Sequence, residues 1–454
     1  MSSVLILNHE PISESMAGPS RRNWELARVL AHRFDVTLAA PGRPAVKSAE
    51  FEVVGWESDL ADELIAAGDV VKASGFLLFE HPNIAKARHL AVDLYDPFPL
   101  ENLHMYDDRT LEDRYRIAAH DRDVQTGLLR AGDVFLCASE RQRDFWLGWL
   151  SAAGRVNPYL HQADADFDRF LLLVPFGVSA EPPQARPHRF RGKLPGIAED
   201  DLIVIWGGGI WNWFDPLTLI RAASETRDRL PHLRIVFPVT SVPSPDVLPM
   251  RMLAEARNLS DHLALTGSRV FFGSSWIRHD DFGGVLLEAD IGVSLHQPSV
   301  ETRFSFRTRI LDYLWAGLPV IATDGDSMAD LIRAQDLGAV VPPGDVDAVA
   351  RALVDLGSDA ARRQACAGRS LSAAARFHWS EVARPLIDYC DAPFQAPDRA
   401  AVQDAPRAAT PDLGQEPEGE RRRLVRRAVQ VLSSEGPMKL AEKGSAYLRR
   451  RTKP

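Results

Sequence analysis

Short apolar runs alternate with stretches of helical periodicity along this chain, and the alternation occurs twice. In the first half, the apolar runs lie at residues 4–8, 36–39, 70–73, 90–94 and 134–138. In the second half, they lie at residues 202–206, 234–238, 270–272, 291–295, 320–322 and 339–341. Strands that alternate with helices are typical of a parallel sheet covered by helices. We therefore predict an α/β protein with two doubly wound, Rossmann-like domains.

Chain length and composition suggest where these domains begin and end. A chain of 454 residues is too long for one ordinary core. We assign residues 1–180 to the first domain and residues 195–375 to the second, with a linker within 179–200 that is rich in proline, arginine and acidic residues. Residues 393–419 lose the periodicity and are rich in proline, alanine and polar residues, which predicts a disordered linker.

Charge is unevenly distributed along the chain. The net charge is −9, but residues 420–454 contain 11 Lys and Arg against 3 Glu, so the remaining residues carry −17. An acidic body argues against nucleic acid as its ligand. The segment 420–454 places basic residues beside apolar stripes, as do helices that lie on anionic bilayers. We expect a basic amphipathic tail at an anionic membrane surface, with a solvated helix or a protein-docking segment as the alternative.

Cysteine usage and the lengths of the apolar runs bear on location. Cys137, Cys366 and Cys390 are widely spaced, so neither a disulfide framework nor a zinc site is indicated. No apolar run reaches the roughly 18 residues of a membrane span, and the N-terminus does not resemble a signal peptide. We expect a cytoplasmic protein, peripheral at the inner face of the membrane.

Residues 301–325 carry the most specific pattern in the chain. We interpret them as an arginine-bearing loop, an amphipathic helix, a break and a short buried strand. Gly317 can adopt the left-handed conformation that ends a helix, and Pro319 cannot continue one. Arg307, Arg309 and free N–H groups at the helix start suit a phosphate, and Asp312 can accept hydrogen bonds from a ribose. A surface helix with solvated arginines is the alternative.

This segment resembles the C-terminal signature of retaining glycosyltransferases with the GT-B fold, the bacterial group called family 4 or group 1. The positions that carry the resemblance are Asp312, Trp315, Ala316, Gly317, Leu318, Pro319, Val320 and Ile321. A second stretch resembles the family's strand and turn through Leu337, Gly338, Val341, Pro342, Pro343, Gly344 and Asp345. The resemblance implies a nucleotide-sugar donor in the C-terminal domain, an acceptor in the N-terminal domain, a cleft between them and a crossover helix at 376–392. The sequence lacks the Asp-x-Asp motif with which GT-A enzymes hold a divalent ion, so we expect neither a metal nor a cofactor.

Two glycine-containing turns are candidate parts of the donor site. The first contains Gly18, which in the resembled family borders the donor diphosphate. The second contains Gly208, Gly209 and Trp211, and the backbone N–H groups of such a loop can surround an anion. Relatives carry an arginine in place of Gly208 and a lysine soon after it. Either the arginines of the 301–325 segment have taken over the cationic role, or the leaving group differs, or turnover is lost.

Residues from three other parts of the chain complete the candidate site. Tyr95 and Asp96 follow a predicted strand, where side chains face the crevice of an α/β fold, and with Arg309 they are the candidate catalytic residues. Ile277 lies where the resembled family holds the nucleobase. Glu301 fits the position beside the donor sugar hydroxyls only with a reorganised loop. The alternatives are a packed aromatic at Tyr95 and a solvated carboxylate at Glu301.

The sequence therefore predicts a retaining glycosyltransferase that uses a nucleotide sugar and a glycan or lipid-linked acceptor. One alternative is a non-catalytic sugar-nucleotide-binding or scaffold protein with a degenerate GT-B site. A second is a GT-B epimerase or phosphorylase. A nicotinamide-dependent enzyme is the third, but the first turn lacks the G-x-G-x-x-G fingerprint that it requires.

Overall fold

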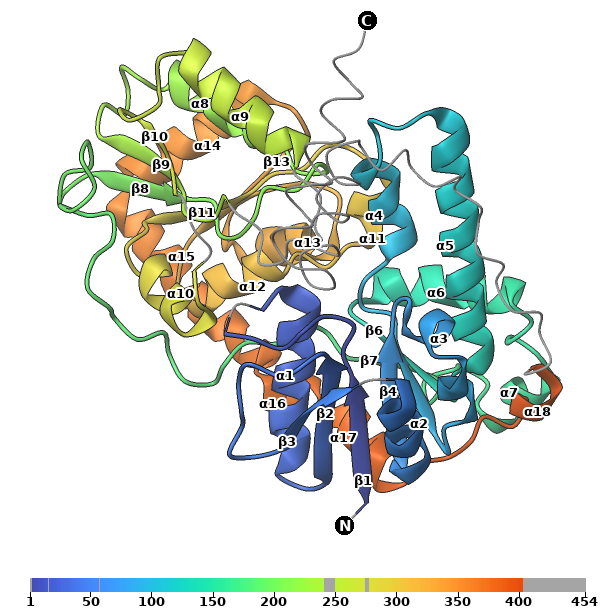
Figure 1. The fold of residues 1–454 in the computed structure, drawn as a ribbon. Helices are drawn as coiled ribbons and strands as arrows, with labels where there is room; N and C mark the ends of the chain where they lie inside the picture. Colours follow the sequence, from blue (N-terminus) through green and yellow to red (C-terminus); the bar gives the residue numbers. More distant parts are fainter. Residues whose placement is uncertain (1, 15, 57, 241–249, 274–276, 403–454) are drawn as a thin grey trace, which may run out of the picture.

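Two parallel sheets, one in each half of the chain, form the framework of the molecule (Figure 1). A computed structural model describes residues 2–402 apart from 15, 57, 241–249 and 274–276. The first sheet has the strand order β3-β2-β1-β4-β5-β6-β7 and the second β10-β9-β8-β11-β12-β13, with parallel pairing throughout. The predicted fold of two doubly wound α/β domains is confirmed.

The first domain contains seven strands and the helices around them. Its strands are β1 (Ser3–Leu7), β2 (Asp35–Pro41), β3 (Glu52–Trp56), β4 (Val70–Ser74), β5 (Leu90–Asp93), β6 (Val134–Cys137) and β7 (Leu171–Leu173). Its helices are α1 (Gly18–Ala31), α2 (Ser58–Ala67), α3 (Leu77–Glu80), η1 (Pro82–Lys86), α4 (Phe98–Met105), α5 (Leu111–Ala131), α6 (Glu140–Ala152) and α7 (Pro158–Ala163). Its sheet reverses strand order between β1 and β4, which creates a crevice at the carboxyl ends of these strands.

The second domain repeats this plan with six strands. They are β8 (Leu202–Ile205), β9 (Leu233–Phe237), β10 (Val270–Phe272), β11 (Ile291–Ser294), β12 (Val320–Thr323) and β13 (Gly338–Val341). The helices are α8 (Pro216–Glu225), α9 (Arg251–His262), α10 (His279–Leu286), α11 (Val300–Phe304), α12 (Thr308–Trp315), α13 (Ser327–Gln335), α14 (Val346–Ser358) and α15 (Ala360–Ala374). Here the strand order reverses between β8 and β11.

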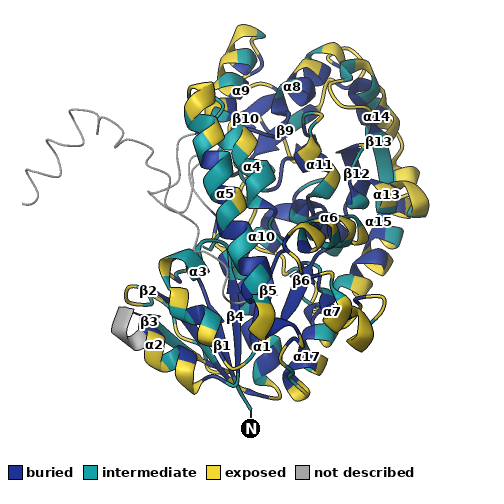
Figure 2. Ribbon diagram, turned by 90° about the vertical axis from the view of Figure 1, so that its right-hand side faces the viewer, coloured by how far each residue is buried: buried dark blue, intermediate teal, exposed yellow. Residues whose placement is uncertain are grey.

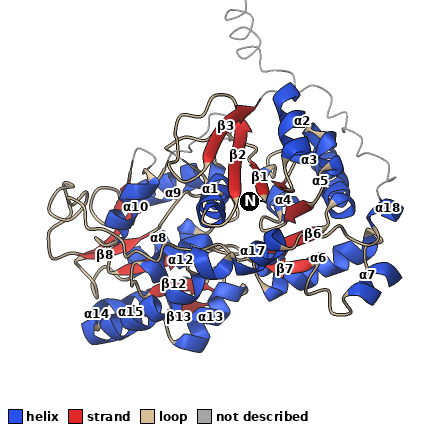
Figure 3. Cartoon of the chain, turned by 90° about the horizontal axis from the view of Figure 1, so that it is seen from below, coloured by secondary structure: helices blue, strands red, loops and turns tan. Residues whose placement is uncertain are grey.

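The central strands are buried on both faces, which explains why they are continuous apolar runs in the sequence. Figure 2 shows the buried strands inside and the exposed residues on the outer faces of the helices. Seen from below, the strands form two separate groups, each flanked by helices (Figure 3). Two edge strands, β3 and β7, were not predicted. Partial burial leaves a mixed pattern in β3, whereas β7 is a short run of three leucines that was visible in the sequence.

The predicted linker at 179–200 contains no helix or strand, but it is firmly attached to the second domain. The carboxylate of Glu288 accepts hydrogen bonds from the backbone N–H groups of Arg189, Phe190 and Arg191 at 2.7–3.1 Å. Glu288 is 3% exposed, so these bonds are shielded from water. The connection between the domains therefore follows a defined path along the second domain.

The chain then returns to the first domain through η2 (Ala375–Phe377), α16 (Trp379–Val382), α17 (Arg384–Asp391) and α18 (Arg399–Val402). The expected start of a disordered linker at 393 does not match the structure, since residues 393–402 pack on the first domain. Asp398 forms a fully buried ion pair with Arg155 at 2.8 Å, and Arg399 pairs with Asp133 at 2.6 Å. The predicted linker beyond residue 402 and the basic tail at 420–454 lie outside the described residues. Within residues 2–402, no described helix is both long and apolar enough to cross a bilayer.

Candidate active site

A cavity of about 420 Å³ lies between the two domains, and loops at the carboxyl ends of both sheets line it. The predicted site residues in its wall are Gly18, Tyr95, Asp96, Gly208, Gly209, Trp211, Ile277, Arg307, Arg309 and Asp312. Residues far apart in the sequence therefore meet at one place. Glu301 is not among the residues that line this cavity.

Arg309 is held against the glycine loop that follows β8. Its guanidinium lies 4.0 Å from the ring centroid of Phe214 and 4.9 Å from that of Trp206, and its Nη2 donates to the Gly209 carbonyl at 2.9 Å. Burial lowers the pKa of Arg309 to about 10, so the group is charged at neutral pH. Its Nη1 is buried and has no hydrogen-bond partner among the described residues. This unused donor on a fixed cation suits a phosphate oxygen.

The glycines of this loop are required by its geometry. Gly208 has φ +101°, a conformation that L side chains rarely adopt. A Cβ on Gly207 would lie 2.9 Å from the ring of Tyr313, whose hydroxyl accepts a hydrogen bond from the Gly207 N–H at 2.6 Å. The arginine that relatives carry in place of Gly208 would therefore be strained here. Arg309 Nη2 lies 3.9 Å from the position of a Cβ on Gly208.

Arg307 also lines the cavity, but its charge is already matched by two carboxylates. Its Nη2 donates to Glu301 Oε2 at 2.7 Å, and its Nε lies 3.6 Å from Asp326 Oδ2. Burial lowers the pKa of Arg307, but Glu301 and Asp326 outweigh this effect and raise it. Glu301, assigned above to the donor sugar hydroxyls, is fully buried and also accepts from Ser305. In the structure, Glu301 is a buried counter-ion of Arg307.

Asp312 on α12 faces the first domain across the cavity. Its Oδ1 accepts from Arg21 Nη1, on α1, at 3.2 Å. Burial raises the pKa of Asp312, while the charges of Arg21 and Arg309 lower it. Arg21 belongs to the first glycine turn, but the sequence analysis gave it no role.

Two tryptophans form one wall of the cavity. The rings of Trp211 and Trp213 stack with centroids 5.6 Å apart and an interplanar angle of 6°. Trp213 is 6% exposed, whereas Trp211 is only partly buried, so Trp211 is the more accessible of the two stacked rings. An accessible indole face suits the apolar face of a sugar or a base.

On the opposite side, Tyr95 follows β5 and packs against a buried charge cluster. The Arg22 guanidinium lies 4.9 Å from the centroid of its ring, and the Tyr95 N–H donates to Asp93 Oδ1 at 3.2 Å. Burial raises the pKa of Tyr95 far above its usual value, so its hydroxyl remains neutral. The ring of Tyr95 is packed, as the alternative interpretation expected, and the residue also lines the cavity.

Asp96 forms a carboxyl pair with Glu101 on α4. The two side chains are hydrogen bonded, and burial raises the pKa of Asp96 to about 6 and that of Glu101 well above its usual value. The carboxylates of Glu301, Asp93 and Glu10 add to the rise at Asp96. The raised pKa values mean that this pair holds a proton to higher pH than two isolated carboxyl groups would. The sequence analysis missed Glu101, although a carboxylate in the turn after Asp96 was visible there.

Gln142 on α6 connects the two halves of the site. Its Nε2 donates to the Tyr95 carbonyl at 2.8 Å and to the Phe304 carbonyl at 2.9 Å, while its Oε1 accepts from the Ala138 N–H at 2.8 Å. The side chain is fully buried. No local pattern in the sequence marked it, since its partners lie 47 and 162 positions away.

The predicted nucleobase loop is only partly described. Ile277 is 7% exposed and lines the cavity, whereas residues 274–276 lie outside the described part of the chain. Among the described residues, no group of three or more His, Cys, Asp or Glu is arranged to hold a metal ion. Independence from metals and cofactors stays a prediction.

Comparison with known proteins gives this site a context. Residues 202–359 match the family model described as "Glycosyl transferases group 1". A curated phosphatidyl-myo-inositol mannosyltransferase of Mycobacterium leprae is 34% identical over 83 residues, which are 18% of this chain and 22% of that protein. The chain therefore matches only about a fifth of that relative's length.

Solved structures extend the similarity to both domains. Sucrose-phosphate synthase from Thermosynechococcus elongatus superposes with a TM-score of 0.63 at 16% identity, over 85% of this chain and 97% of that one. HepE of Anabaena, in complex with UDP and glucose, superposes with a TM-score of 0.61 at 15% identity, over 86% of this chain and 100% of that one. At such identities the likeness establishes the GT-B fold. The similarity to group 1 glycosyltransferases itself is confined to residues 202–359.

Proposed function

We propose that this protein transfers a hexosyl group from a nucleotide sugar to a glycan or lipid-linked acceptor, with retention and without a metal. The observation that carries the proposal is Arg309. It is a buried cation with an unused Nη1 donor, and it faces the same cavity as Asp312. The match of residues 202–359 to group 1 glycosyltransferases supports it, as does the fold shared with HepE, which was solved with UDP and glucose.

In this proposal the donor diphosphate lies at the glycine loop. The bond between the anomeric carbon and the leaving phosphate breaks, and its electron pair goes to the phosphate oxygen. Arg309 Nη1 and the N–H groups of Gly208 and Gly209 stabilise the negative charge that develops there. Asp312 accepts hydrogen bonds from the ribose. The acceptor hydroxyl forms the new bond on the same face, and its proton passes to the leaving phosphate.

Residues of the first domain orient the acceptor. Tyr95 and Asp96 face the cavity from the carboxyl end of β5, and Asp96 together with Glu101 can hydrogen bond to the incoming hydroxyl. Gln142 holds the Tyr95 and Phe304 segments at fixed positions relative to each other. Closure of the domains around the cavity would exclude water, which otherwise hydrolyses the donor.

Two measurements test this function. Isothermal titration calorimetry with UDP and GDP tests nucleotide binding, and NMR of the product formed from a UDP-hexose reports both turnover and anomeric configuration. Nucleotide binding with slow donor hydrolysis is the expected result. Release of a product of inverted configuration would overturn retention. Binding without any turnover, with or without acceptor, would favour the non-catalytic sugar-nucleotide-binding alternative, which the missing cations near Gly208 support.

Localisation remains part of the proposal. We propose a cytoplasmic enzyme whose basic segment 420–454 contacts anionic lipid, which would bring a lipid-linked acceptor near the cavity. The test is sedimentation with anionic vesicles of the full-length chain and of a chain that ends at residue 402. That end point keeps α18 and its buried ion pairs intact. Equal sedimentation of the two chains would contradict the assignment.

A further inference from the structure

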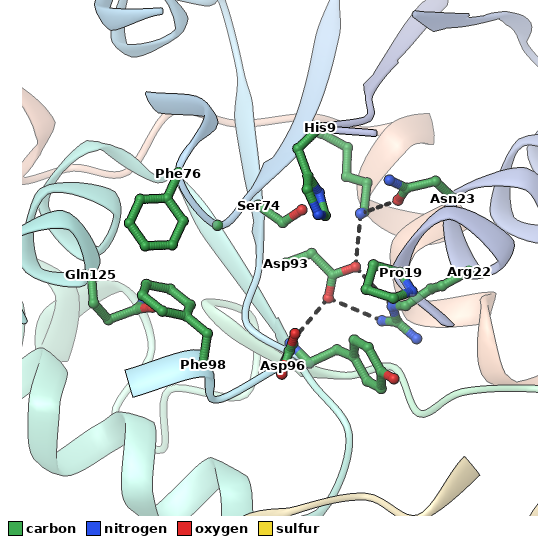
Figure 4. A pocket seen from close by; sticks show the side chains of 13 residues that line it. His9, Pro19, Arg22, Asn23, Ser74, Phe76, Asp93, Asp96, Phe98 and Gln125 are labelled. Carbon is green, nitrogen blue, oxygen red and sulfur yellow. Dashed lines mark hydrogen bonds and ion pairs between the residues drawn. The ribbon is translucent and has the colours of Figure 1, made fainter. Parts of the chain in front are cut away.

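A second cavity adjoins the first on the side of the N-terminal domain (Figure 4). Its volume is about 130 Å³, and the two cavities share His9, Pro19, Tyr95 and Asp96 in their walls. A cavity of about 150 Å³ can hold a benzene ring. This space therefore fits a group of about one six-membered ring, next to the residues that face the donor cavity.

One wall of this second cavity contains two buried cations but only one buried carboxylate. Lys72 Nζ lies 2.8 Å from Asp93 Oδ2, and Arg22 binds both oxygens of the same carboxylate at 2.7 and 3.1 Å. Arg22 also donates to the carbonyls of Val174 and Pro175 at 2.8 Å, so its donors are engaged. Burial lowers the pKa of Lys72, although Asp93 opposes this effect. Lys72 Nζ also donates to the Asn23 Oδ1, which is uncharged, so Lys72 and Arg22 share the single carboxylate of Asp93.

The other wall carries an unsatisfied amide. Gln125 on α5 is 1% exposed, and its Nε2 has no hydrogen-bond partner among the described residues. Buried donors without a partner are rare in folded proteins. The rings of Phe76 and Phe98, with centroids 4.9 Å apart, provide an apolar surface beside it. Figure 4 shows Gln125, Phe76 and Phe98 on one side of the cavity and Asp93 with Arg22 on the other.

We infer that the second cavity binds an acceptor ring that carries a carboxylate or a phosphate. Lys72 holds the anionic substituent, Gln125 donates a hydrogen bond to the ring or to the anion, and Phe76 and Phe98 contact its apolar face. The ligand anion provides the counter-charge that the cluster of Lys72, Arg22 and Asp93 lacks. This inference rests on the proposed transfer reaction, and it narrows the acceptor to an acidic sugar or a phosphorylated ring.

The distribution of charge also orients the ligand. Acidic groups gather around the shared wall, where Asp96 and Glu101 are hydrogen bonded and Glu10 lines the first cavity. The cluster in the wall of the second cavity has two cationic side chains, Lys72 and Arg22, for the one carboxylate of Asp93. An acceptor with an anion at one end therefore places that anion at Lys72. Its hydroxyl end then points to Asp96 and the donor cavity.

Calorimetric titration of the full-length protein tests this site. The probes are methyl glucoside, methyl glucuronide and glucose 6-phosphate at one ionic strength. We expect at least one anionic probe to bind about tenfold or more tightly than the glucoside, and the better of the two identifies the anion as carboxylate or phosphate. Lys72→Met should abolish this preference. Gln125→Leu should lower the affinity for the anionic probe about fivefold. Lys86→Met, which removes an exposed charge of the same domain, should change neither value.

Two results would overturn the inference. The first is equal binding of all three probes, or no binding of any. The second is anion binding that Arg309→Ala abolishes but Gln125→Leu leaves unchanged, because the probe would then occupy the donor cavity. Thermal unfolding checks each variant, and Gln125→Leu keeps the test valid if Lys72→Met fails to fold. A parallel titration with UDP separates the proposed transfer reaction from the proposed acidic acceptor. If UDP binds but the anionic probes are not preferred, only the acidic acceptor is refuted.

Discussion

The guanidinium of Arg21 on α1 lies 3.2 Å from the carboxylate of Asp312 on α12, and this ion pair joins the two domains across the candidate active site. Arg21 donates to Oδ1 of Asp312, so the residue combines a contact between the domains with a carboxylate that lines the cavity. A nucleotide that binds Asp312 would therefore act directly on the contact that holds the cleft in this arrangement.

The first prediction concerns this carboxylate. Asp312→Asn preserves the shape but removes the charge, so UDP affinity should fall about tenfold, or about 1.4 kcal/mol, by calorimetry. The matched variant Arg21→Gln breaks the ion pair and keeps the carboxylate, and its UDP affinity should remain the same or rise. If Asp312→Asn binds UDP like the unmodified protein, the role of Asp312 is confined to the contact between the domains.

Arg309 is the second target. Arg309→Ala should remove about 2–4 kcal/mol of transition-state stabilisation, the scale for loss of one preorganised donor. Arg309→Lys keeps the charge but loses the planar fork that stacks on Phe214, so it should recover only part of the loss. The measurement is kcat/KM for donor turnover. If Arg309→Ala leaves kcat/KM unchanged, Arg309 does not contact the donor in the transition state.

Arg307 should behave differently from Arg309. Arg307→Ala leaves the buried carboxylates of Glu301 and Asp326 without their cation, which should lower the free energy of unfolding by about 3–5 kcal/mol. Urea unfolding followed by tryptophan fluorescence measures this. Arg303→Ala, at an exposed position of the neighbouring helix α11, is the control and should cost far less. Equal losses in the two variants would show that the Arg307 network contributes little to stability.

Asp96 should make stability depend on pH. Burial raises the pKa of Asp96 from 3.8 to about 6, so between these values the unfolded chain ionises while the folded protein keeps the proton. Native stability therefore falls as pH rises through this window. Asp96→Asn should raise the melting temperature near pH 7.5 and change it little near pH 4. Asp108→Asn, at an exposed site, should show no such difference. An equal effect of Asp96→Asn at both pH values would refute the raised pKa.

The last prediction concerns α18. A chain that ends at residue 392 leaves Arg155 and Asp133 buried without Asp398 and Arg399, whereas a chain that ends at residue 402 keeps both pairs. The shorter chain should be less stable by at least about 3 kcal/mol in denaturant unfolding, since each lost partner leaves an uncompensated buried charge. Similar stability of the two chains would mean that α18 packs without contributing to the fold.

The strands and the two-domain division could be read from the sequence, because a strand buried on both faces must be apolar along its length. The same local logic predicted an amphipathic helix within residues 301–325, which the structure places at Thr308–Trp315, and its end at Gly317, which has φ +68°. The edge strand β3 was not predicted because partial burial leaves it a mixed pattern, and the run of three leucines in β7 was overlooked. The predicted start of the disordered linker, residue 393, came too early in the chain. Residues 393–402 are held by ion pairs with residues more than 240 positions away, which no local pattern shows.

The sequence by itself therefore determined which residue types stand at the carboxyl ends of the strands, and so which loops line the cavity. Only the tertiary structure decided how those side chains are paired. Arg307 and Arg309 are two positions apart and look equivalent in the sequence, yet Glu301 and Asp326 neutralise the first and leave the second with a free donor. The physical reason is that charge compensation acts over a few ångströms in space, and neighbours such as Arg21, Glu101 and Gln125 come from distant parts of the chain.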